Sequence, residues 1–440
     1  MIIPDKKANE HACQRSIEED GIYALKEIRL HTKKDYCEKE LRNEIDLLHH
    51  LDHPNIIRAF EVYRDGPNHL AVVLDLCRGG DLNSRFPYTE KNAAYVVFQI
   101  VEAVRFLHSH RIMHRDLKLE NIMFEFDDPS DFSIKLIDFG LATVYSSDRK
   151  IFHECVGTLY TMAPEVLRKN YTCQADMWSI GVIAFHLLCG HRPFRASSKR
   201  NLKRQICQGT SCFRDPTWKS LPWAARDFIR RLLQPDPQLR CTADVAIRHP
   251  WLRVTNEVSA LRTLPEDSLK ALVEFSNSSD FHKLVLQVIA RKASAADIRG
   301  LRHIFSDLDL GKNGVITRTE FRKALTRIKS FDIDHVDELF DDLDVDKSGV
   351  LEYTEFLAAE LGSHIALKDS CLHDAFRDFD TDGSGYITRQ DLRSIFGEQA
   401  SDLYIDKLIE QGDFGGDGKI DYHEFVRLCE GAGITISAHT

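Results

Sequence analysis

The last third of this 440-residue chain contains a fourfold repeat, and this repeat constrains the fold more than any other feature. Segments of the form D-x-x-x-x-G-x-[IL]-x-x-x-[DE] begin at Asp309, Asp344, Asp380 and Asp413, so their starts are 35, 36 and 33 residues apart. Apolar residues flank the first segment at helical spacing. A short polar loop between helices, repeated at this period, predicts a helix–loop–helix unit used four times. The break at residues 362–368 predicts two pairs of units.

The side chains of these loops predict calcium binding. Ca²⁺ takes about six to eight oxygen ligands, which a loop of about twelve residues supplies from positions 1, 3, 5, 7, 9 and 12. The loop at residues 344–355 has a complete set: Asp344, Asp346, Ser348, the Val350 carbonyl, Glu352 and Glu355. The loop at residues 380–391 has a set that ends in aspartate: Asp380, Asp382, Ser384, the Tyr386 carbonyl, Thr388 and Asp391.

The first and fourth loops each lack one side-chain oxygen, because Gly311 and Gly415 stand at position 3. The loop at residues 309–320 offers five ligands: Asp309, Asn313, the Val315 carbonyl, Thr317 and Glu320. The loop at residues 413–424 also offers five: Asp413, Asp417, the Lys419 carbonyl, Asp421 and Glu424. None of the four loops fits the strict EF-hand pattern, but four loops in phase, each with glycine at position 6, predict an EF-hand array.

The loops are predicted to differ in affinity for calcium. The second is expected to bind most tightly, and the first and fourth more weakly because each has lost an oxygen ligand. In the third loop, Asp391 is one methylene shorter than glutamate, so bidentate coordination is less favourable and Mg²⁺ competes better.

The formal net charge of −10 conceals two parts of different character. Residues 301–440 carry 15 Lys and Arg against 29 Asp and Glu, a net charge of −14, whereas residues 1–300 carry 43 against 39, or +4. This balance argues against a nucleic-acid-binding protein. The eleven cysteines include no C-x-x-C pair, so neither a disulfide scaffold nor a structural zinc site is expected.

The same composition predicts a monomer in the cytoplasm. No apolar stretch approaches the ~20 residues that span a bilayer, and Met1–Pro4 does not start a secretory signal. Ile2 stands where N-myristoylation needs glycine, so the sequence as given shows no acylation signal. A membrane anchor and a nuclear location remain open alternatives.

The first ~250 residues predict an α/β domain. Strands are expected at 22–30, 70–76 and 133–137, and helices at 36–51 and 93–110. Residues 253–300 then form a helical connector, in which 280–292 has one apolar face and flanking basic residues. Such a stretch is usually a helix packed in a core. Beside an acidic sensor it is also typical of a calmodulin-type target.

Three short motifs in the first part predict phosphoryl transfer: His114-Arg115-Asp116-Leu117-Lys118-Leu119-Glu120-Asn121, then Asp138-Phe139-Gly140, then Ala163-Pro164-Glu165. This chemistry needs an aligned hydroxyl, metal ions on the phosphates and neutralised charge. We expect Asp116 to accept or orient the hydroxyl proton, and Asn121 and Asp138 to hold Mg²⁺. Lys26 on a strand would contact the α- and β-phosphates, and Glu44 on the following helix would pair with it. Any one motif alone is weak, but their order and spacing together are a strong signal.

Over residues 10–252 the chain resembles the protein kinase family, which implies a bilobal fold. In this resemblance the segment Asp176-Met177-Trp178-Ser179-Ile180-Gly181 braces the catalytic loop, and Arg240 pairs with Glu165. Lys118 and Thr158 resemble serine/threonine kinases rather than tyrosine kinases. Asp81 and Glu120 match carboxylates that bind ribose and an arginine upstream of the phosphorylated hydroxyl; ordinary solvated acids are the alternative.

The resemblance also assigns Glu154 to the activation loop. It lies where many kinases carry an activating phosphothreonine, so its carboxylate is expected to pair with Arg115 without phosphorylation. An exposed acid without a role is the alternative.

One expected kinase element is absent: residues 1–9, where a glycine-rich loop over the ATP phosphates belongs, contain no glycine. Two interpretations compete. Either the loop has been lost from the start of an intact enzyme, or the protein is a calcium-sensing pseudokinase or scaffold with impaired ATP binding. The first is favoured, because Lys26, Glu44, Asp116, Asn121 and Asp138 are all present.

Taken together, the chain resembles the calcium-dependent protein kinases, in which a kinase is fused to a calmodulin-like domain. The resemblance implies an α+β multidomain protein: a kinase domain (1–252) with a truncated N-lobe, an autoinhibitory junction (253–300) and an all-α domain of four EF-hands (301–440). It implies ATP, Mg²⁺ and Ca²⁺ as cofactors and protein substrates, with upstream basic residues. The junction helix would be the intramolecular target of the EF-hands, released from the substrate cleft by Ca²⁺.

Overall fold

The computed structural model describes residues 23–29, 38–64, 69–146, 151–209, 211–253, 264–293, 295–326, 335–364, 369–396 and 401–430. Residues 1–9, where a glycine-rich loop was expected, lie outside the described residues. The chain divides into two compact units. The first unit contains the described residues up to Arg253, and the second contains nearly all those from Leu264 onward.

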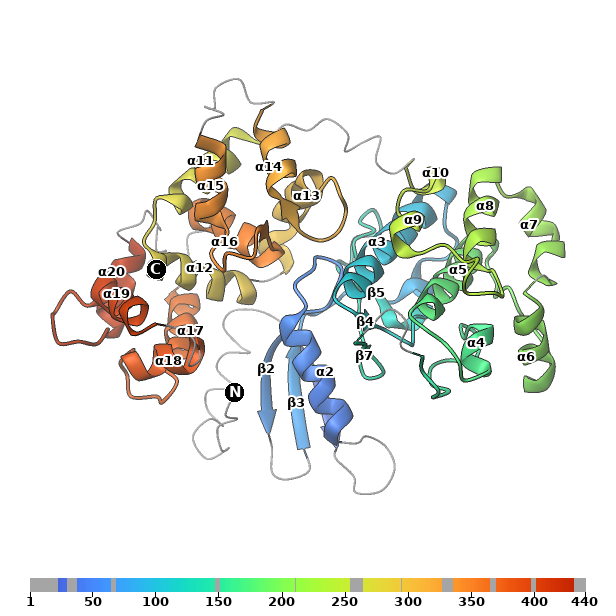
Figure 1. Ribbon diagram of the computed structural model, residues 1–440, viewed down its shortest axis with the longest axis horizontal. Coiled ribbons are helices and arrows are strands. Elements are labelled where there is room, and N and C mark those ends of the chain that lie inside the picture. Colours follow the sequence, from blue (N-terminus) through green and yellow to red (C-terminus); the bar gives the residue numbers. More distant parts are fainter. Residues whose placement is uncertain are drawn as a thin grey trace. The chain divides into compact units, whose positions relative to one another are not determined.

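The first unit begins with an antiparallel three-stranded sheet of order β1-β3-β2 (Figure 1). Its elements are β1 (Ala24–Arg29), α2 (Glu38–His50), β2 (Ala59–Arg64) and β3 (His69–Leu74). Lys26 of β1 lies opposite Val72 of β3. The strand β2 was not among the predicted strands, because apolar and polar residues do not alternate in Ala59–Arg64.

The rest of the first unit is mainly helical, and its core lies around α3 (Glu90–Ser109) and α5 (Gln174–Cys189). The side chain of Thr89 caps α3, and α5 is apolar on all sides, which explains its burial. Shorter helices surround this core: α4 (Pro164–Leu167), α6 (Lys199–Gln208), α7 (Pro216–Ser220), α8 (Trp223–Leu232), α9 (Ala243–Ala246) and α10 (Pro250–Arg253).

Short pairs of strands and 3-10 turns surround the predicted catalytic segments. The paired strands are β4 (Ile112–Met113) with β7 (Thr143–Val144), and β5 (Ile122–Phe124) with β6 (Ile134–Leu136). The turns are η2 (Leu82–Arg85), η3 (Leu119–Asn121) and η4 (Ser211–Arg214). The backbone amide of Ile137 donates to the carbonyl of Asn121 at 2.9 Å, so the Asp-Phe-Gly segment begins beside the end of the catalytic loop.

The second unit contains the four predicted helix–loop–helix units. Its elements are α13 (Ala295–Leu308), β8 (Ile316–Thr317), α14 (Arg318–Leu325), α15 (Val336–Leu343), β9 (Val350–Leu351), α16 (Tyr353–His364), α17 (Asp369–Phe379), α18 (Arg389–Phe396), α19 (Asp402–Gly412) and α20 (Tyr422–Glu430). Position 8 of each loop pairs with its neighbour: Ile316 with Leu351, and Ile387 with Ile420. The loops therefore form two pairs.

Two connector helices, α11 (Glu266–Ser276) and α12 (Asp280–Lys292), pack among these helices and share their core. Phe281 of α12 is fully buried, and its ring lies 5.5 Å from that of Phe379. The basic end of α12 is also paired, since Lys292 Nζ lies 2.8 Å from Asp378. The apolar face of α12 is thus part of the second unit's interior.

Candidate active site and calcium loops

The carboxylate of Asp116 contacts three other predicted active-site residues. Its Oδ2 accepts from Lys118 Nζ at 2.7 Å and from Asn121 Nδ2 at 3.2 Å, and its Oδ1 accepts from Thr158 Oγ1 at 2.7 Å. Burial by itself would raise the pKa of Asp116, but the bonds from Lys118 and Thr158 outweigh it and hold the pKa below its usual range. The carboxylate is therefore ionised at neutral pH and able to accept a hydrogen bond from a substrate hydroxyl.

Gly157 allows the activation segment to approach Asp116 this closely. Its φ is +97°, and a Cβ there would lie 2.4 Å from the carbonyl oxygen of Arg115. The next residue, Thr158, donates its backbone amide to Asp116 Oδ1 at 2.8 Å. A side chain at position 157 would therefore separate the two segments.

Asp176 of α5 holds the backbone of the catalytic loop through hydrogen bonds. This buried carboxylate accepts from the backbone amides of His114 and Arg115, both at 3.0 Å, and His108 Nε2 lies 3.0 Å away. Arg115 has a φ of +69°, a left-handed conformation that needs such support. The ring of Phe139 is fully buried, 5.0 Å from that of His114, and connects the two motifs.

Lys26 lies between two carboxylates contributed by different elements. Its Nζ is 2.6 Å from Glu44 on α2 and 3.7 Å from Asp138 in the Asp-Phe-Gly segment. The predicted Lys26–Glu44 ion pair is thus formed. Asp138 has a φ of +65° and a partly exposed side chain, so its carboxylate is accessible to a cation.

Two contacts hold the activation segment. Glu154 Oε2 accepts from Arg115 Nη1 at 2.6 Å, the contact expected from the sequence, although the Glu154 side chain is exposed. Further along, Glu165 and Arg240 make a buried bidentate pair with N–O distances of 2.5 and 3.0 Å. Phe152 also pairs with Tyr171 through backbone bonds in both directions.

The two predicted substrate-reading acids lie in different surroundings. Asp81 caps η2, where its carboxylate accepts from the backbone and side-chain amides of Asn83, both at 3.0 Å. Glu120 accepts from the Tyr160 hydroxyl at 2.5 Å, and the Arg192 guanidinium lies 3.7 Å from the centre of the Tyr160 ring. No contact described here joins Asp81 to Glu120. No local pattern in the sequence marks Tyr160 and Arg192, so neither was among the predicted site residues.

A buried ionic network behind the site was also missed. Asp75, which directly follows β3, is paired with Arg58 at 2.8 Å and with Lys135 at 3.2 Å, and Lys135 lies 3.6 Å from Glu125. Burial alone would raise the pKa of Asp75, but Arg58 and Lys135 hold it well below its usual range. The sequence signal for this network is Lys135, a charged residue between the two apolar residues of β6, because a buried charge needs a partner.

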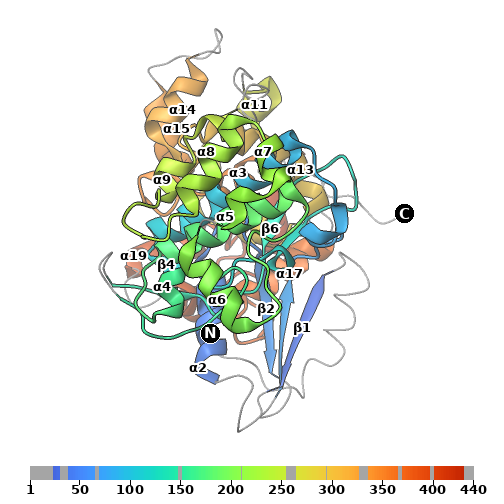
Figure 2. The same cartoon turned by 90° about the vertical axis from the view of Figure 1, so that its right-hand side faces the viewer.

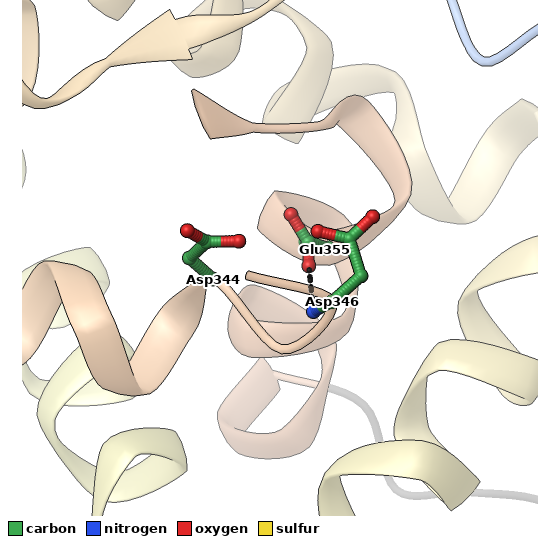
Figure 3. Close-up of side chains that lie close together, drawn as sticks. All are labelled: Asp344, Asp346 and Glu355. Atoms are coloured by element: carbon green, nitrogen blue, oxygen red, sulfur yellow. Dashed lines mark hydrogen bonds between the residues drawn. The ribbon is translucent and has the colours of Figure 1, made fainter. Parts of the chain in front are cut away.

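In the second unit, the second and third loops each gather three carboxylates. Within the described residues, oxygens of Asp344, Asp346 and Glu355 lie within 4.8 Å of one another, and so do those of the matching triad in the third loop: Asp380, Asp382 and Asp391. Figure 3 shows the Glu355 carboxylate turned toward the loop, where it accepts from the Asp346 amide at 3.4 Å. In the third loop, the Asp391 carboxylate lies within the same distance of Asp380 and Asp382, although its side chain is one methylene shorter than glutamate.

Burial, reinforced by the nearby Asp346 carboxylate, raises the pKa of Glu355 to about 8. The main cause of the raised pKa is burial of the carboxylate, and the nearby negative charge adds to it; a bound cation relieves both effects. The donor set therefore fits Ca²⁺.

In the first and fourth loops the backbone amide at position 3, here that of a glycine, also contacts the last glutamate. Gly415 donates its amide to Glu424 Oε1 at 2.6 Å, and a Cβ at this glycine would lie 3.1 Å from that oxygen. In the first loop Glu320 accepts from the amides of Gly311 and Thr317. Glycine at position 3 leaves each of these loops with one side-chain oxygen fewer, which is the basis of the predicted order of affinity.

No helix in the described part of the chain is both long enough and apolar enough to cross a membrane.

Comparison with known proteins identifies the family. The protein kinase domain matches residues 12–252, and the EF-hand domain pair matches residues 298–359 and again 369–430. Calcium-dependent protein kinase 7 of Oryza sativa subsp. japonica is 37% identical over 428 residues, which cover 95% of this chain and 78% of that protein. Calcium-dependent protein kinase SK5 of Glycine max is 40% identical over 420 residues, 93% of this chain and 81% of that protein. The bilobal kinase fold and the EF-hand array are thus confirmed, and the chain belongs to the calcium-dependent protein kinases, serine/threonine kinases that carry EF-hands.

Proposed function

We propose that this chain transfers the γ-phosphate of ATP to Ser or Thr of protein substrates, with Asp116 as the group that accepts the hydroxyl proton. The arrangement that carries this proposal is the ionised Asp116 carboxylate, held by Lys118, Asn121 and Thr158 at the distances given above. Lys118 balances the negative charge of Asp116 and is near the position that the transferred phosphoryl group would occupy.

Lys26, kept in place by Glu44, would contact the α- and β-phosphates. Asn121 and Asp138 would hold Mg²⁺, which neutralises charge on the phosphates when it is bound.

Asp81 would bind the ribose and, with Glu120, a basic residue upstream of the phosphorylated hydroxyl. Glu154 would keep the activation segment ordered through Arg115, so that control passes to another part of the chain.

Calcium control would act through the connector, with α12 as the intramolecular target of the EF-hands. Supporting this, the apolar face of α12 is buried among EF-hand helices, and Lys292 at its basic end pairs with Asp378. A target in the same chain needs no partner, so we propose that the protein acts as a monomer. The described cysteines are free thiols, which favours a reducing compartment such as the cytoplasm.

The test is a peptide-kinase assay on the full chain, with ATP and Mg²⁺, in Ca²⁺ and in EGTA. Activity is expected in Ca²⁺ and should fall in EGTA, while Asp116→Asn should lose about 10²–10⁴-fold in kcat. Activity equal in Ca²⁺ and EGTA would refute calcium control, and an active Asp116→Asn variant would refute the role of Asp116. Absence of both activity and ATP binding would instead favour a calcium-sensing scaffold.

A further inference from the structure

The helix α6 presents an unusual concentration of positive charge. Lys199, Arg200, Lys203 and Arg204 are all exposed, and α6 contains no acidic residue. Spacings of four residues place these side chains on neighbouring turns of one face, where like charges destabilise a helix. Within the described part of the chain, no ion pair engages any of the four. Their repulsion is therefore not relieved inside the first unit.

The face of α6 opposite the basic residues is apolar and packs against the first unit. Ile206 is fully buried and Leu202 packs against the core of the first unit, so the apolar side of the helix is already occupied. A helix that inserts into a membrane surface needs a free apolar face beside its basic face. The basic face of α6 therefore fits a soluble polyanion better than a lipid surface.

The positive charge continues from α6 toward the active site. Figures 1 and 2 both show α6 beside α4, the helix of the Ala-Pro-Glu segment, and the two helices are in contact. The segment before α6 adds Arg195 and Arg192, both exposed. Arg192 stacks on Tyr160, whose hydroxyl binds Glu120 of the catalytic loop. A peptide that leaves the active site along this path would meet cations from Arg192 to Arg204.

We propose that this basic surface, formed by Arg192, Arg195, Lys199, Arg200, Lys203 and Arg204, binds a segment rich in Asp and Glu in the protein substrate. The proposal rests on the proposed kinase activity and adds a substrate class to it. Exposed charges of one sign attract the opposite charge at long range and favour encounter. Because the acidic segment lies outside the reacting atoms, its binding lowers KM and leaves kcat nearly unchanged.

The experiment uses the full chain and two peptides with the same phosphorylated serine and flanking residues. One peptide continues into four glutamates and the other into four glutamines. At an ionic strength of about 0.05 M, we expect the KM for the acidic peptide to be about five- to tenfold lower, and the difference to disappear near 0.5 M salt. Substituting Arg200→Gln together with Arg204→Gln should abolish the difference while leaving kcat and KM for the neutral peptide unchanged.

A matched control removes two exposed charges elsewhere on the first unit, through Lys91→Gln with Arg248→Gln. The control should keep the preference for the acidic peptide. Equal KM values for the two peptides in the unmodified chain, or an equal loss of preference in the two double variants, would overturn the proposal.

Fluorescence anisotropy of the labelled peptides separates this proposal from the kinase assignment. Tighter binding of the acidic peptide, lost with Arg200→Gln and Arg204→Gln, supports the surface even if no phosphate is transferred; that outcome would reject the proposed activity alone. Binding to vesicles that contain about 30% phosphatidylserine, lost in the same variant and with no preference between peptides, would assign the surface to membranes and overturn the proposal.

Discussion

Single carboxylates in this protein are held by several donors, some from the same loop and some from distant segments. Asp116 is fixed by Lys118, Asn121 and Thr158, and Asp176 by amides of the catalytic loop itself. Glu154 differs, because its partner Arg115 is mostly buried while Glu154 itself is exposed. An ion pair whose carboxylate is solvent-exposed contributes only about 0–1 kcal/mol to stability, so any effect of Glu154 should be seen in activity rather than in folding.

We therefore predict that Glu154→Gln lowers kcat by about tenfold, since a small displacement of the activation segment misplaces Thr158 and the substrate. The thermal unfolding temperature should change little, because the Glu154 side chain is solvent-exposed. Peptide-kinase assays and calorimetry on the full chain measure the two effects. Glu90→Gln, which alters another exposed glutamate of the first unit, should leave both unchanged. If Glu154→Gln kept full activity, Glu154 would be an ordinary surface acid.

At the scale of elements, the four loops share one backbone plan but differ in their oxygen ligands. The second and third loops gather three carboxylates each, and these belong to different pairs of loops. The position-8 strands join each of them to a loop with glycine at position 3. Each pair thus combines one loop in which three carboxylates lie close together with one that has no side-chain oxygen at position 3.

This difference predicts unequal effects of the same substitution. Glu355→Gln should weaken the tightest calcium-binding step by about tenfold or more, because a buried carboxylate ligand is lost. The matched change Glu320→Gln, at the same position of the first loop, should affect that step much less. Isothermal titration of the full chain with Ca²⁺ measures both. Equal losses would show that the first loop binds as tightly as the second.

Glu360 of α16 gives the second unit a pH dependence. Burial raises its pKa to about 7 from an ordinary value of 4.5, and a hydrogen bond with Ser268 only partly opposes this. Because the folded-state pKa lies above the unfolded value, its stabilising contribution is complete below pH 4.5 and is lost as the pH rises through about 7.

In calcium-free buffer, α16 should therefore open more easily at pH 8 than at pH 5, by up to about 3 kcal/mol from this group. Glu360→Gln should remove this component, although other acids such as Glu355 still titrate in both proteins. Hydrogen exchange of α16 in the full chain, compared between the two proteins at both pH values, measures the difference. An unchanged pH dependence in Glu360→Gln would show that Glu360 is ionised when folded.

At the scale of the whole molecule, two units of opposite charge carry different chemistry in one chain. The acidic excess of residues 301–440 reflects the calcium loops, whereas the proposed phosphoryl-transfer groups lie in the slightly basic part. The connector helices α11 and α12 share a core with the EF-hands, so calcium binding and the position of the connector are expected to be coupled.

That coupling predicts slower hydrogen exchange in α12 with Ca²⁺ than with EGTA. Phe281→Ala should reduce the difference, because removing a buried phenyl ring weakens the docking of α12 by about 3–5 kcal/mol. Phe228→Ala, an equally buried ring in α8 of the first unit, serves as the control and should leave the α12 difference intact. If exchange in α12 did not respond to Ca²⁺, the connector would not be the target of the EF-hands.

The sequence by itself determined the features that short-range spacing encodes. Glycine at position 6 and aliphatic residues at position 8 sufficed to predict four loops, because a loop and its flanking helices are local structure. The break at residues 362–368 predicted that the loops form two pairs. The motifs around Asp116 and Asp138 sufficed to predict the kinase fold and its phosphoryl-transfer groups. The pair Lys26–Glu44, 18 residues apart, followed from the same resemblance.

Only the tertiary structure decided which distant side chains meet. The apolar face of α12 was compatible with any hydrophobic surface, and packing alone placed Phe281 against Phe379. Tyr160 and Arg192 came to Glu120 from two separate segments, and the edge strand β2 had no alternation to reveal it. Periodicity specifies which residues of an element face a core, whereas the partner across that core is chosen by shape and charge over the whole chain.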